Sequence, residues 1–276
     1  MSWSAVVAAL DEGERLRSRV ALYLHPLAGR PIIWHVVRAV LDAVPAPADV
    51  RVLHRPGVAL RFGEDAERVT FEAVEQGREL AALRGAVDGA ETKVVVDGAA
   101  PLLTAATVSR LARAGESAVS AMPDESEAPP WIAVAGDGRA LAAADDPRAR
   151  PGAAHVTPAG PEELLRVVDR LTLAGAAVAM RDRLVRAHGE RGVTFMLPAT
   201  TWVDVDVRIG GDTLIYPGVV LEGETEIGRE CVIGPHSRIV ESRVGRGAEL
   251  VGWNYLARTE IRSHAVLEAY ERRGQD

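Results

Sequence analysis

Aliphatic residues recur at every sixth position in the C-terminal third of the chain. The seven positions are Val203, Ile209, Ile215, Leu221, Ile227, Ile233 and Ile239. A period of six matches neither the 3.6-residue turn of an α-helix nor the two-residue alternation of a β-strand. It is typical of hexapeptide repeats, in which each coil of a parallel β-helix stacks one aliphatic residue on the coil below. Gly218 and Gly223 suit the sharp corners between faces, because glycine adopts positive φ without strain.

The ladder is short. Six residues for each of three sides give about eighteen residues per coil. Residues 203–250 therefore supply fewer than three coils, and from residue 251 the spacing loosens into at most one degenerate coil. A β-helix leaves unpaired backbone groups at both ends, so we expect the charged residues 268–276 to cap it. Cys231 precedes a ladder position by two residues, which predicts a buried, inert thiol.

The first part of the chain alternates short apolar runs with helical patterns. The expected strands lie at residues 5–8, 50–53, 69–71, 94–96 and 118–122, and the expected helices at residues 31–44, 73–87 and 105–114. Such alternation is typical of a mostly parallel sheet with helices on its faces. Residues 131–143 predict a hairpin that turns at Asp137-Gly138. Residues 161–190 predict one long helix rich in alanine and arginine.

Three parts follow from these patterns. We expect an α/β domain over residues 1–160, a linking helix over residues 161–191 and a short β-helix with a C-terminal cap over residues 192–276. The net charge of −7 argues against broad binding to nucleic acids or acidic membranes. No run approaches eighteen apolar residues, so we expect no membrane span. A single cysteine cannot form an internal disulfide, which favours a reducing cytoplasm.

Three segments give the sequence a specific resemblance to a known family. They are residues 24–31 (LHPLAGRP), residues 161–165 (PEELL) and residues 192–240, which include PATT at 198–201. These segments are similar to the bifunctional N-acetylglucosamine-1-phosphate uridylyltransferase / glucosamine-1-phosphate acetyltransferase family. The resemblance implies a Rossmann-like nucleotidyltransferase domain, a linking helix and a left-handed β-helix that usually trimerises.

The phosphate-binding loop of that family resembles Ala-Ala-Gly-x-Gly-Thr-Arg-Met, followed by Pro-Lys. Aligned on residues 24–25, this chain reads ALDEGERL at residues 9–16 and Ala-Leu in place of Pro-Lys. Glycines there let backbone amides approach phosphates, and cations stabilise charge during phosphoryl transfer. Of the distinctive residues only Gly13 and Arg15 remain. The resemblance therefore leaves Arg15 as the candidate catalytic residue and Gly13 as a candidate substrate-binding residue.

Carboxylates fill the rest of this loop. Asp11, Glu12 and Glu14 would lie beside a bound triphosphate. At roughly 4 Å and an effective dielectric constant near 20, each like-charge contact costs on the order of 4 kcal/mol before screening. A loop of this charge is poorly suited to a nucleoside triphosphate.

The positions that hold Mg²⁺ in the family are changed as well. Ala99 replaces the Asp of a Tyr-Gly-Asp-x-Pro-Leu stretch, and Val168 replaces an Asn at the start of the linking helix. Asp97 and Asp169 could bind a metal only after a shift in register. The family's Gly-Thr-Gly-x-Ala, which contacts uracil and sugar, appears here as GRELA from Gly77 onwards. Gly77 is therefore a second candidate substrate-binding residue.

Acetyl transfer in the family uses later coils of a longer β-helix and a C-terminal tail. With so few coils, we expect no complete coenzyme A groove in this chain. Trp202, Tyr216 and Trp253 lie among the repeats and predict a packed or subunit-facing side of the β-helix.

Two functions stay open at this point. The first is a non-catalytic homologue without a cofactor, which forms a homotrimer or mixed trimer through the β-helix. It would act as a scaffold, regulator or sensor of a nucleotide sugar near UDP-N-acetylglucosamine metabolism. The second is an active sugar-1-phosphate nucleotidyltransferase with Mg²⁺ on Asp97 and Asp169 and with Arg15 at the phosphate. The resemblance also implies that a part following residue 143, which carries the family's Glu-Lys and Asn-x-Gly sugar contacts, is missing here. Losing the lysine, both metal ligands and these sugar contacts should remove at least about four decades of rate, which favours the first function.

Overall fold

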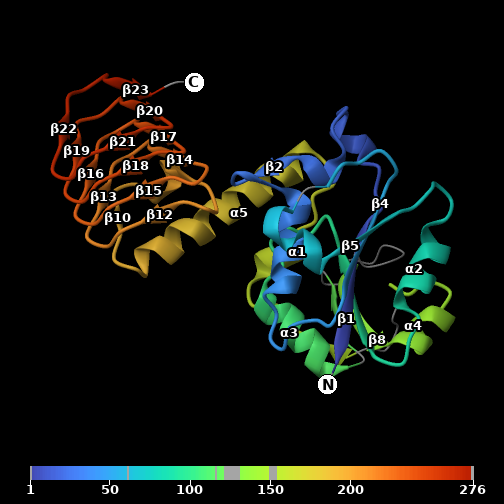
Figure 1. Ribbon diagram of the computed structural model, residues 1–276. Coiled ribbons are helices and arrows are strands. Elements are labelled where there is room, and N and C mark those ends of the chain that lie inside the picture. The colour runs from blue at the N-terminus through green and yellow to red at the C-terminus, as the bar shows by residue number, and fades with distance from the viewer. Residues whose placement is uncertain (1, 61, 116, 121–130, 149–153, 275–276) are drawn as a thin grey trace. The chain divides into compact units, whose positions relative to one another are not determined.

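The computed structural model describes residues 2–60, 62–115, 117–120, 131–148 and 154–274 (Figure 1). The chain divides into two compact units. The first comprises Met1–His25 and Pro31–Ala176, and the second comprises Pro26–Arg30 and Ala177–Asp276. None of the helices in the described residues is both long and apolar enough to cross a membrane.

The first unit is built on a seven-stranded sheet with the order β5-β4-β1-β6-β8-β7-β9. Its strands are β1 (Trp3–Ala9), β4 (Val50–His54), β5 (Thr70–Ala73), β6 (Thr92–Asp97), β7 (Ser117–Ser120), β8 (Trp131–Asp137) and β9 (Ala154–His155). Strands β5, β4, β1 and β6 are parallel, whereas β8 runs antiparallel to β6 and β7. This arrangement confirms the expected α/β class.

Helices cover both faces of this sheet. They are α1 (Ile32–Leu41), α2 (Glu79–Val87), α3 (Ala105–Ala114) and α4 (Gly138–Ala143). Successive side chains of a strand point to opposite faces. In β1, Ala5 and Val7 belong to one apolar core with α1 and α3, whereas Val6 and Ala8 belong to another with α2 and α4. The unbroken apolar run of residues 5–9 in β1 is thus explained by burial on both sides.

The predicted hairpin at residues 131–143 is wrong. Only β8 is a strand, and α4 begins directly after it. The Asp137 carboxylate accepts a hydrogen bond of 3.0 Å from the Ala140 N–H and so caps the helix instead of initiating a tight turn.

The predicted linking helix begins later than expected. Pro161–Leu164 forms one 3₁₀ turn, and the long helix α5 spans Arg170–Gly189. Between them the backbone is extended, and the Val167 N–H donates to the Ala99 carbonyl oxygen at 2.8 Å. The Asp169 carboxylate then accepts the Thr172 N–H at 2.8 Å, which fixes the start of α5.

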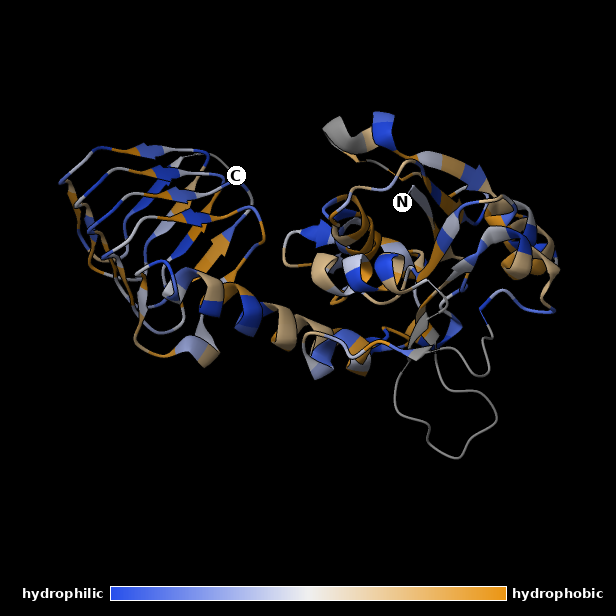
Figure 2. Cartoon of the chain, turned by 90° about the horizontal axis from the view of Figure 1, so that it is seen from below, coloured by the Kyte–Doolittle hydropathy of each residue, from blue (hydrophilic) through white to orange (hydrophobic). Residues whose placement is uncertain are grey.

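The second unit contains a left-handed parallel β-helix (Figure 1). Pro26–Leu27 (β2) pairs with Arg30–Pro31 (β3) in a separate two-stranded sheet. The helix strands are β10 (Thr194–Phe195), β11 (Trp202–Val203), β12 (Arg208–Ile209), β13 (Leu214–Ile215), β14 (Val220–Glu222), β15 (Glu226–Ile227), β16 (Val232–Ile233), β17 (Arg238–Val240), β18 (Arg243–Val244), β19 (Glu249–Leu250), β20 (Tyr255–Ala257), β21 (Glu260–Ile261), β22 (Val266–Leu267) and β23 (Arg272–Gly274). All seven predicted ladder residues are buried. Figure 2 shows both hydrophobic and hydrophilic residues along the strands of the β-helix.

The β-helix has more coils than the sequence period suggested. Its three sheets hold five, five and four strands. The step from Ile239 to Val244 is five residues, as is the step from Leu256 to Ile261, yet the strands stay in register. A strict period of six loses the ladder at the first short step. Within the predicted cap, Arg272–Gly274 pairs with β20 as a further rung.

Candidate functional site

In the loop after β1, a carboxylate of the chain itself, that of Asp11, accepts the backbone N–H of Gly13. This is the amide that would otherwise be available to a phosphate. Gly13 adopts φ +67°, and a Cβ there would come within 2.8 Å of the Leu22 Cβ, so only glycine fits. Asp11 Oδ1 accepts the Gly13 N–H at 2.9 Å. Arg15 follows on a short 3₁₀ turn and is exposed. The two predicted residues therefore share one loop, but the amide of Gly13 is already occupied.

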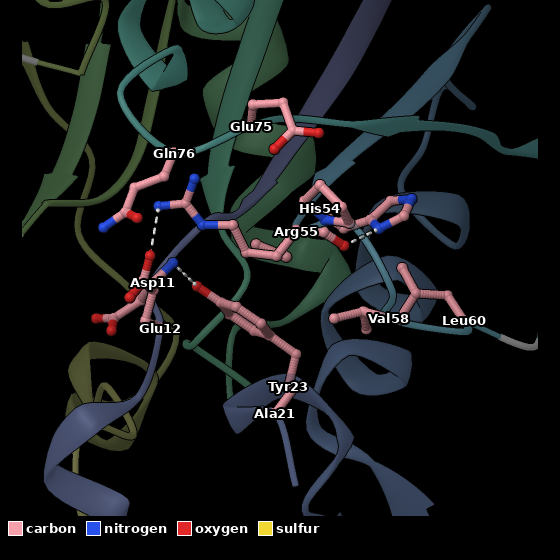
Figure 3. A pocket seen from close by; sticks show the side chains of 12 residues that line it. Asp11, Glu12, Ala21, Tyr23, His54, Arg55, Val58, Leu60, Glu75 and Gln76 are labelled. Carbon is pink, nitrogen blue, oxygen red and sulfur yellow. Dashed lines mark hydrogen bonds and ion pairs between the residues drawn. The ribbon is translucent and has the colours of Figure 1, made fainter. Parts of the chain in front are cut away.

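Two neighbouring cavities lie beside this loop in the first unit. The first has a volume of about 360 Å³ and is lined by Ala9, Asp11, Glu12, Ala21, Tyr23, His54, Arg55, Pro56, Val58, Leu60, Glu75 and Gln76 (Figure 3). The second, of about 480 Å³, is lined by Asp11, Glu12, Gly13, Glu14, Arg15, Arg55, Gln76, Glu79, Arg166 and Val168. The first is walled mainly by apolar side chains and the second mainly by charged ones.

The backbone N–H of Gly77, like that of Gly13, is hydrogen-bonded to a carboxylate of the same chain. Glu79 Oε1 accepts the Gly77 N–H at 3.0 Å and also the Arg55 Nη2 at 2.7 Å. Arg55 Nη2 lies 3.5 Å from Glu12 Oε1 as well. A hydrogen bond from the Glu79 backbone N–H, together with those from Arg55 and Gly77, lowers the pKa of the Glu79 carboxyl to about 2. The carboxylate is therefore charged at neutral pH and neutralises the arginine that lines both cavities.

Asp97 is paired with an arginine rather than left open for a metal ion. Its side chain is 3% exposed, and its carboxylate accepts the Arg166 Nε–H and, at 2.9 Å, the Ala99 N–H. Burial raises the pKa of the Asp97 carboxyl, and the adjacent Arg166 guanidinium opposes that shift. Both oxygens already have donors, and a cation of this chain stands beside them.

Asp169 serves as the N-cap of α5. Hydrogen bonds from the backbone and hydroxyl of Thr172 lower the pKa of its carboxyl. The described residues hold no group of three or more His, Cys, Asp or Glu suited to a metal. Binding of Mg²⁺ by this pair stays a prediction of the active-enzyme hypothesis.

Tyr23 is a cavity residue that the sequence did not reveal. It is 3% exposed, and its hydroxyl oxygen accepts the Asp11 N–H at 2.7 Å. Burial raises the pKa of the hydroxyl, and the Asp97 carboxylate raises it further, so Tyr23 is a neutral donor at pH 7. Arg55 and Arg166 were also missed. Their partners lie 24 and 69 residues away, and no local pattern marks such pairs.

Comparison with known proteins agrees with this architecture. The model of bacterial transferase hexapeptide (six repeats) matches residues 206–240. The bifunctional protein GlmU of Brevibacillus brevis is 29% identical in an alignment that is 335 residues long with its gaps. The alignment covers 98% of this chain and 72% of that protein. GlmU of Streptomyces avermitilis is 31% identical over 90% of this chain and 64% of that protein. The chain belongs to the GlmU family.

Other matches cover a smaller share of this chain or of the relative. GlmU of Caldanaerobacter subterraneus is 46% identical over 90 residues, or 33% of this chain and 20% of that protein. This chain therefore spans one fifth of the length of the Caldanaerobacter protein in that match, and slightly less than two thirds of the length of the Streptomyces protein. A solved nucleotidyl transferase from Methanothermobacter thermautotroptrophicus is similar over 67% of this chain and 99% of its own, with 23% identity and a TM-score of 0.49.

Proposed function

We propose that this GlmU-family protein does not transfer nucleotides and that its first unit binds a small ligand without converting it. One observation carries the proposal: apart from Arg15, the groups that would act on a phosphate are already bonded to carboxylates of the same chain. Asp11 accepts the Gly13 amide, Glu79 accepts the Gly77 amide and Arg55, and Asp97 accepts Arg166. Transition-state stabilisation requires such donors to be free and aimed at the developing charge.

The size of the loss supports this conclusion. Losing one preorganised donor typically lowers the rate by about 10²–10³, and a catalytic metal contributes several kcal/mol more. A triphosphate would also have to displace Glu79 from Arg55, a pair held at 2.7 Å. Each displaced pair subtracts from the affinity for the nucleotide, because its own attraction is lost on binding.

The active-enzyme hypothesis has one observation in its favour. Arg15, Arg55 and Arg166 line the same cavity, and three guanidinium groups could in principle hold a polyphosphate. Its metal, however, would require Asp97 to leave Arg166. Breaking a buried pair leaves an uncompensated charge, which costs more than a surface pair does.

The β-helix supports a proposal of trimers, homomeric or mixed. One face carries an alternating ladder of Arg208, Glu226, Arg243 and Glu260. Glu226 lies 3.3 Å from Arg208 and 3.0 Å from Arg243, so both arginines are paired within the chain. Another corner stacks His236, Trp253 and Tyr270 with ring centroids 5.6 Å apart, and Tyr270 is 70% exposed. Trp and Tyr are enriched at the centres of interfaces. This corner is therefore the proposed subunit contact.

The proposed setting follows from the family. We infer a role near UDP-N-acetylglucosamine metabolism and, from the single buried cysteine, a reducing cytoplasm.

Nucleotide binding tests the proposal. Isothermal titration of the intact protein with UTP and Mg²⁺ is expected to give no binding heat up to millimolar nucleotide. Micromolar binding that requires Mg²⁺ and is lost in Arg15→Ala would instead support the active enzyme. The matched control is Arg19→Ala, an exposed arginine of the same segment that lines neither cavity.

A further inference from the structure

The smaller cavity offers an unusual set of polar groups around apolar walls. Val58, Leu60 and Ala21 form part of those walls. Tyr23 projects into the same space from the opposite side to Arg55, beside Asp11 and Glu12, as Figure 3 shows. A volume of about 360 Å³ is within the range of small-molecule sites.

Tyr23 has a hydrogen-bond donor to spare. Its hydroxyl oxygen accepts the Asp11 N–H, but no acceptor for the hydroxyl proton occurs in the part of the chain that the structure describes. The side chain is 3% exposed and lines the cavity. A buried donor without an acceptor is costly unless a ligand or water completes it. This proton therefore points to a ligand that presents an acceptor, such as a carbonyl oxygen.

Three of the other polar residues at the cavity are carboxylates, namely Asp11, Glu12 and Glu75. Asp11 and Glu75 have no cationic partner among the described residues, and ionised carboxylates only accept hydrogen bonds. Asp11 lies next to Tyr23, because its N–H is bonded to the Tyr23 hydroxyl at 2.7 Å. A ligand that fits both must carry N–H donors directly beside its carbonyl group.

We propose that this cavity binds a planar heterocycle with a 2-amino-4-oxopyrimidine edge, the edge shared by guanine and the pterins. The carbonyl oxygen would accept from Tyr23, and the adjacent ring N–H and amino group would donate to the Asp11 carboxylate as a bidentate pair. The ring faces would contact the apolar walls. Uracil fits less well, because it has a carbonyl on each side of its single N–H, and one carbonyl would then face a carboxylate.

The charge of the surroundings makes a second distinction. Four carboxylates line the neighbouring cavity, where phosphates attached to a nucleoside would lie: Asp11, Glu12, Glu14 and Glu79. Of its three arginines, Arg55 is paired with Glu79 and Arg166 with Asp97, which leaves Arg15. Like charges repel phosphates there. The unphosphorylated nucleoside is therefore the better ligand, the reverse of what a nucleotidyltransferase requires. This inference rests on the proposed function, since it assumes binding without transfer.

A series of matched ligands tests the inference on the unmodified protein. The probes are guanosine, inosine (which lacks only the 2-amino group), uridine and GTP, together with neopterin for the pterin class. We expect guanosine and neopterin to bind at least tenfold more tightly than inosine, uridine or GTP in titration calorimetry. Inosine or uridine binding as tightly as guanosine would overturn the assignment, and so would tighter binding of GTP.

Variants locate the site. Asp11→Asn keeps an acceptor for the Gly13 N–H but places an amide where the carboxylate was, so guanosine affinity is expected to fall tenfold or more. Tyr23→Phe removes the donor and should weaken every carbonyl-bearing probe. Asp88→Asn, an exposed carboxylate away from both cavities, is the matched control. Unchanged affinity in folded Asp11→Asn would overturn the inference.

Failure here and failure of the proposed function look different. Folded wild-type protein that binds none of the nucleosides or neopterin at millimolar concentration refutes the ligand class, and the absence of transfer stands. Release of pyrophosphate from any triphosphate refutes the proposed function itself.

Discussion

Carboxylates at and beside the site decide what it can do. Asp11 accepts a loop amide, Glu79 holds Arg55, and Asp97 holds Arg166. In each case a group able to stabilise a phosphate is used inside the chain. The chemistry of the site is therefore set less by the residues that the family pattern lacks than by the residues that have replaced them.

The ion pair of Asp97 and Arg166 gives the first prediction. Arg166→Ala leaves a carboxylate that is 3% exposed without its cation, and we expect a loss of about 3 kcal/mol in the free energy of unfolding. Asp97→Asn combined with Arg166→Ala should recover more than half of that loss, because no charge stays buried. Urea denaturation measures both variants. A double variant no more stable than the single one would contradict the account.

Glu79 gives a prediction of pH dependence. Its folded pKa of about 2 lies below the ordinary value of 4.5. The stabilisation that it provides is therefore present above about pH 4.5 and is lost as the pH falls from 4.5 toward 2. As the pH falls over that range, the melting temperature of the wild type should decrease more steeply than that of Glu79→Gln. Parallel pH profiles for the two proteins would show that the carboxylate is not held as the structure has it.

At the scale of single elements, Asp169 distinguishes capping from metal binding. Asp169 is the N-cap of α5, so Asp169→Ala is expected to lower the free energy of unfolding by about 1 kcal/mol. Asp169→Asn should change it by only a few tenths of a kcal/mol, because Asn also caps helices well. Mg²⁺ should alter none of these values. A melting temperature that Mg²⁺ raises in the wild type but not in Asp169→Ala would reverse the assignment and favour a metal ligand.

The later coils of the β-helix give an element-scale prediction about packing. Leu256 is fully buried although it lies beyond the first five-residue step. Leu256→Ala is expected to cost about 2–5 kcal/mol, like the same change at Leu221. Val266→Ala, at a 58% exposed position of β22, should stay within about 0.5 kcal/mol. Equal, small effects at Leu256 and Val266 would mean that the last coils are not packed as described.

The elements also show what a sequence can and cannot predict. The ladder was predictable because each coil repeats one requirement, an aliphatic residue in the same place. Its extent was not, since one five-residue step moves every later position out of phase. Asp137 was misjudged because Asp-Gly suits a tight turn and a helix N-cap equally. The parallel sheet followed from apolar runs such as residues 94–96, which only burial on both faces explains.

The candidate site was predictable only as a set of departures. Alignment could locate Gly13, Arg15 and Gly77. It could not predict that the backbone amides of Gly13 and Gly77 are each hydrogen-bonded to a carboxylate of the chain. Tyr23 and Arg166 carry no local signal, because their roles arise from contacts made only in the folded chain.

For the whole molecule, assembly is the first open property. We expect trimers of three 29.4 kDa chains, about 88 kDa by light scattering. Replacing Trp253 and Tyr270 with alanine should shift the mass toward the monomer, since this removes the exposed aromatic corner. Arg243→Ala, on the face where Arg243 is paired with Glu226 of the same chain, should leave the mass unchanged. A monomeric wild type would remove the proposed trimer.

Pyrophosphate release is the most direct test of the central claim that this GlmU-family protein has lost nucleotidyl transfer. The intact protein is incubated with Mg²⁺, each nucleoside triphosphate and a panel of sugar-1-phosphates. We expect no release above the blank from protein that is folded by circular dichroism. Turnover that Arg15→Ala abolishes would contradict the account, because it would show that the self-neutralised site opens and works as an enzyme.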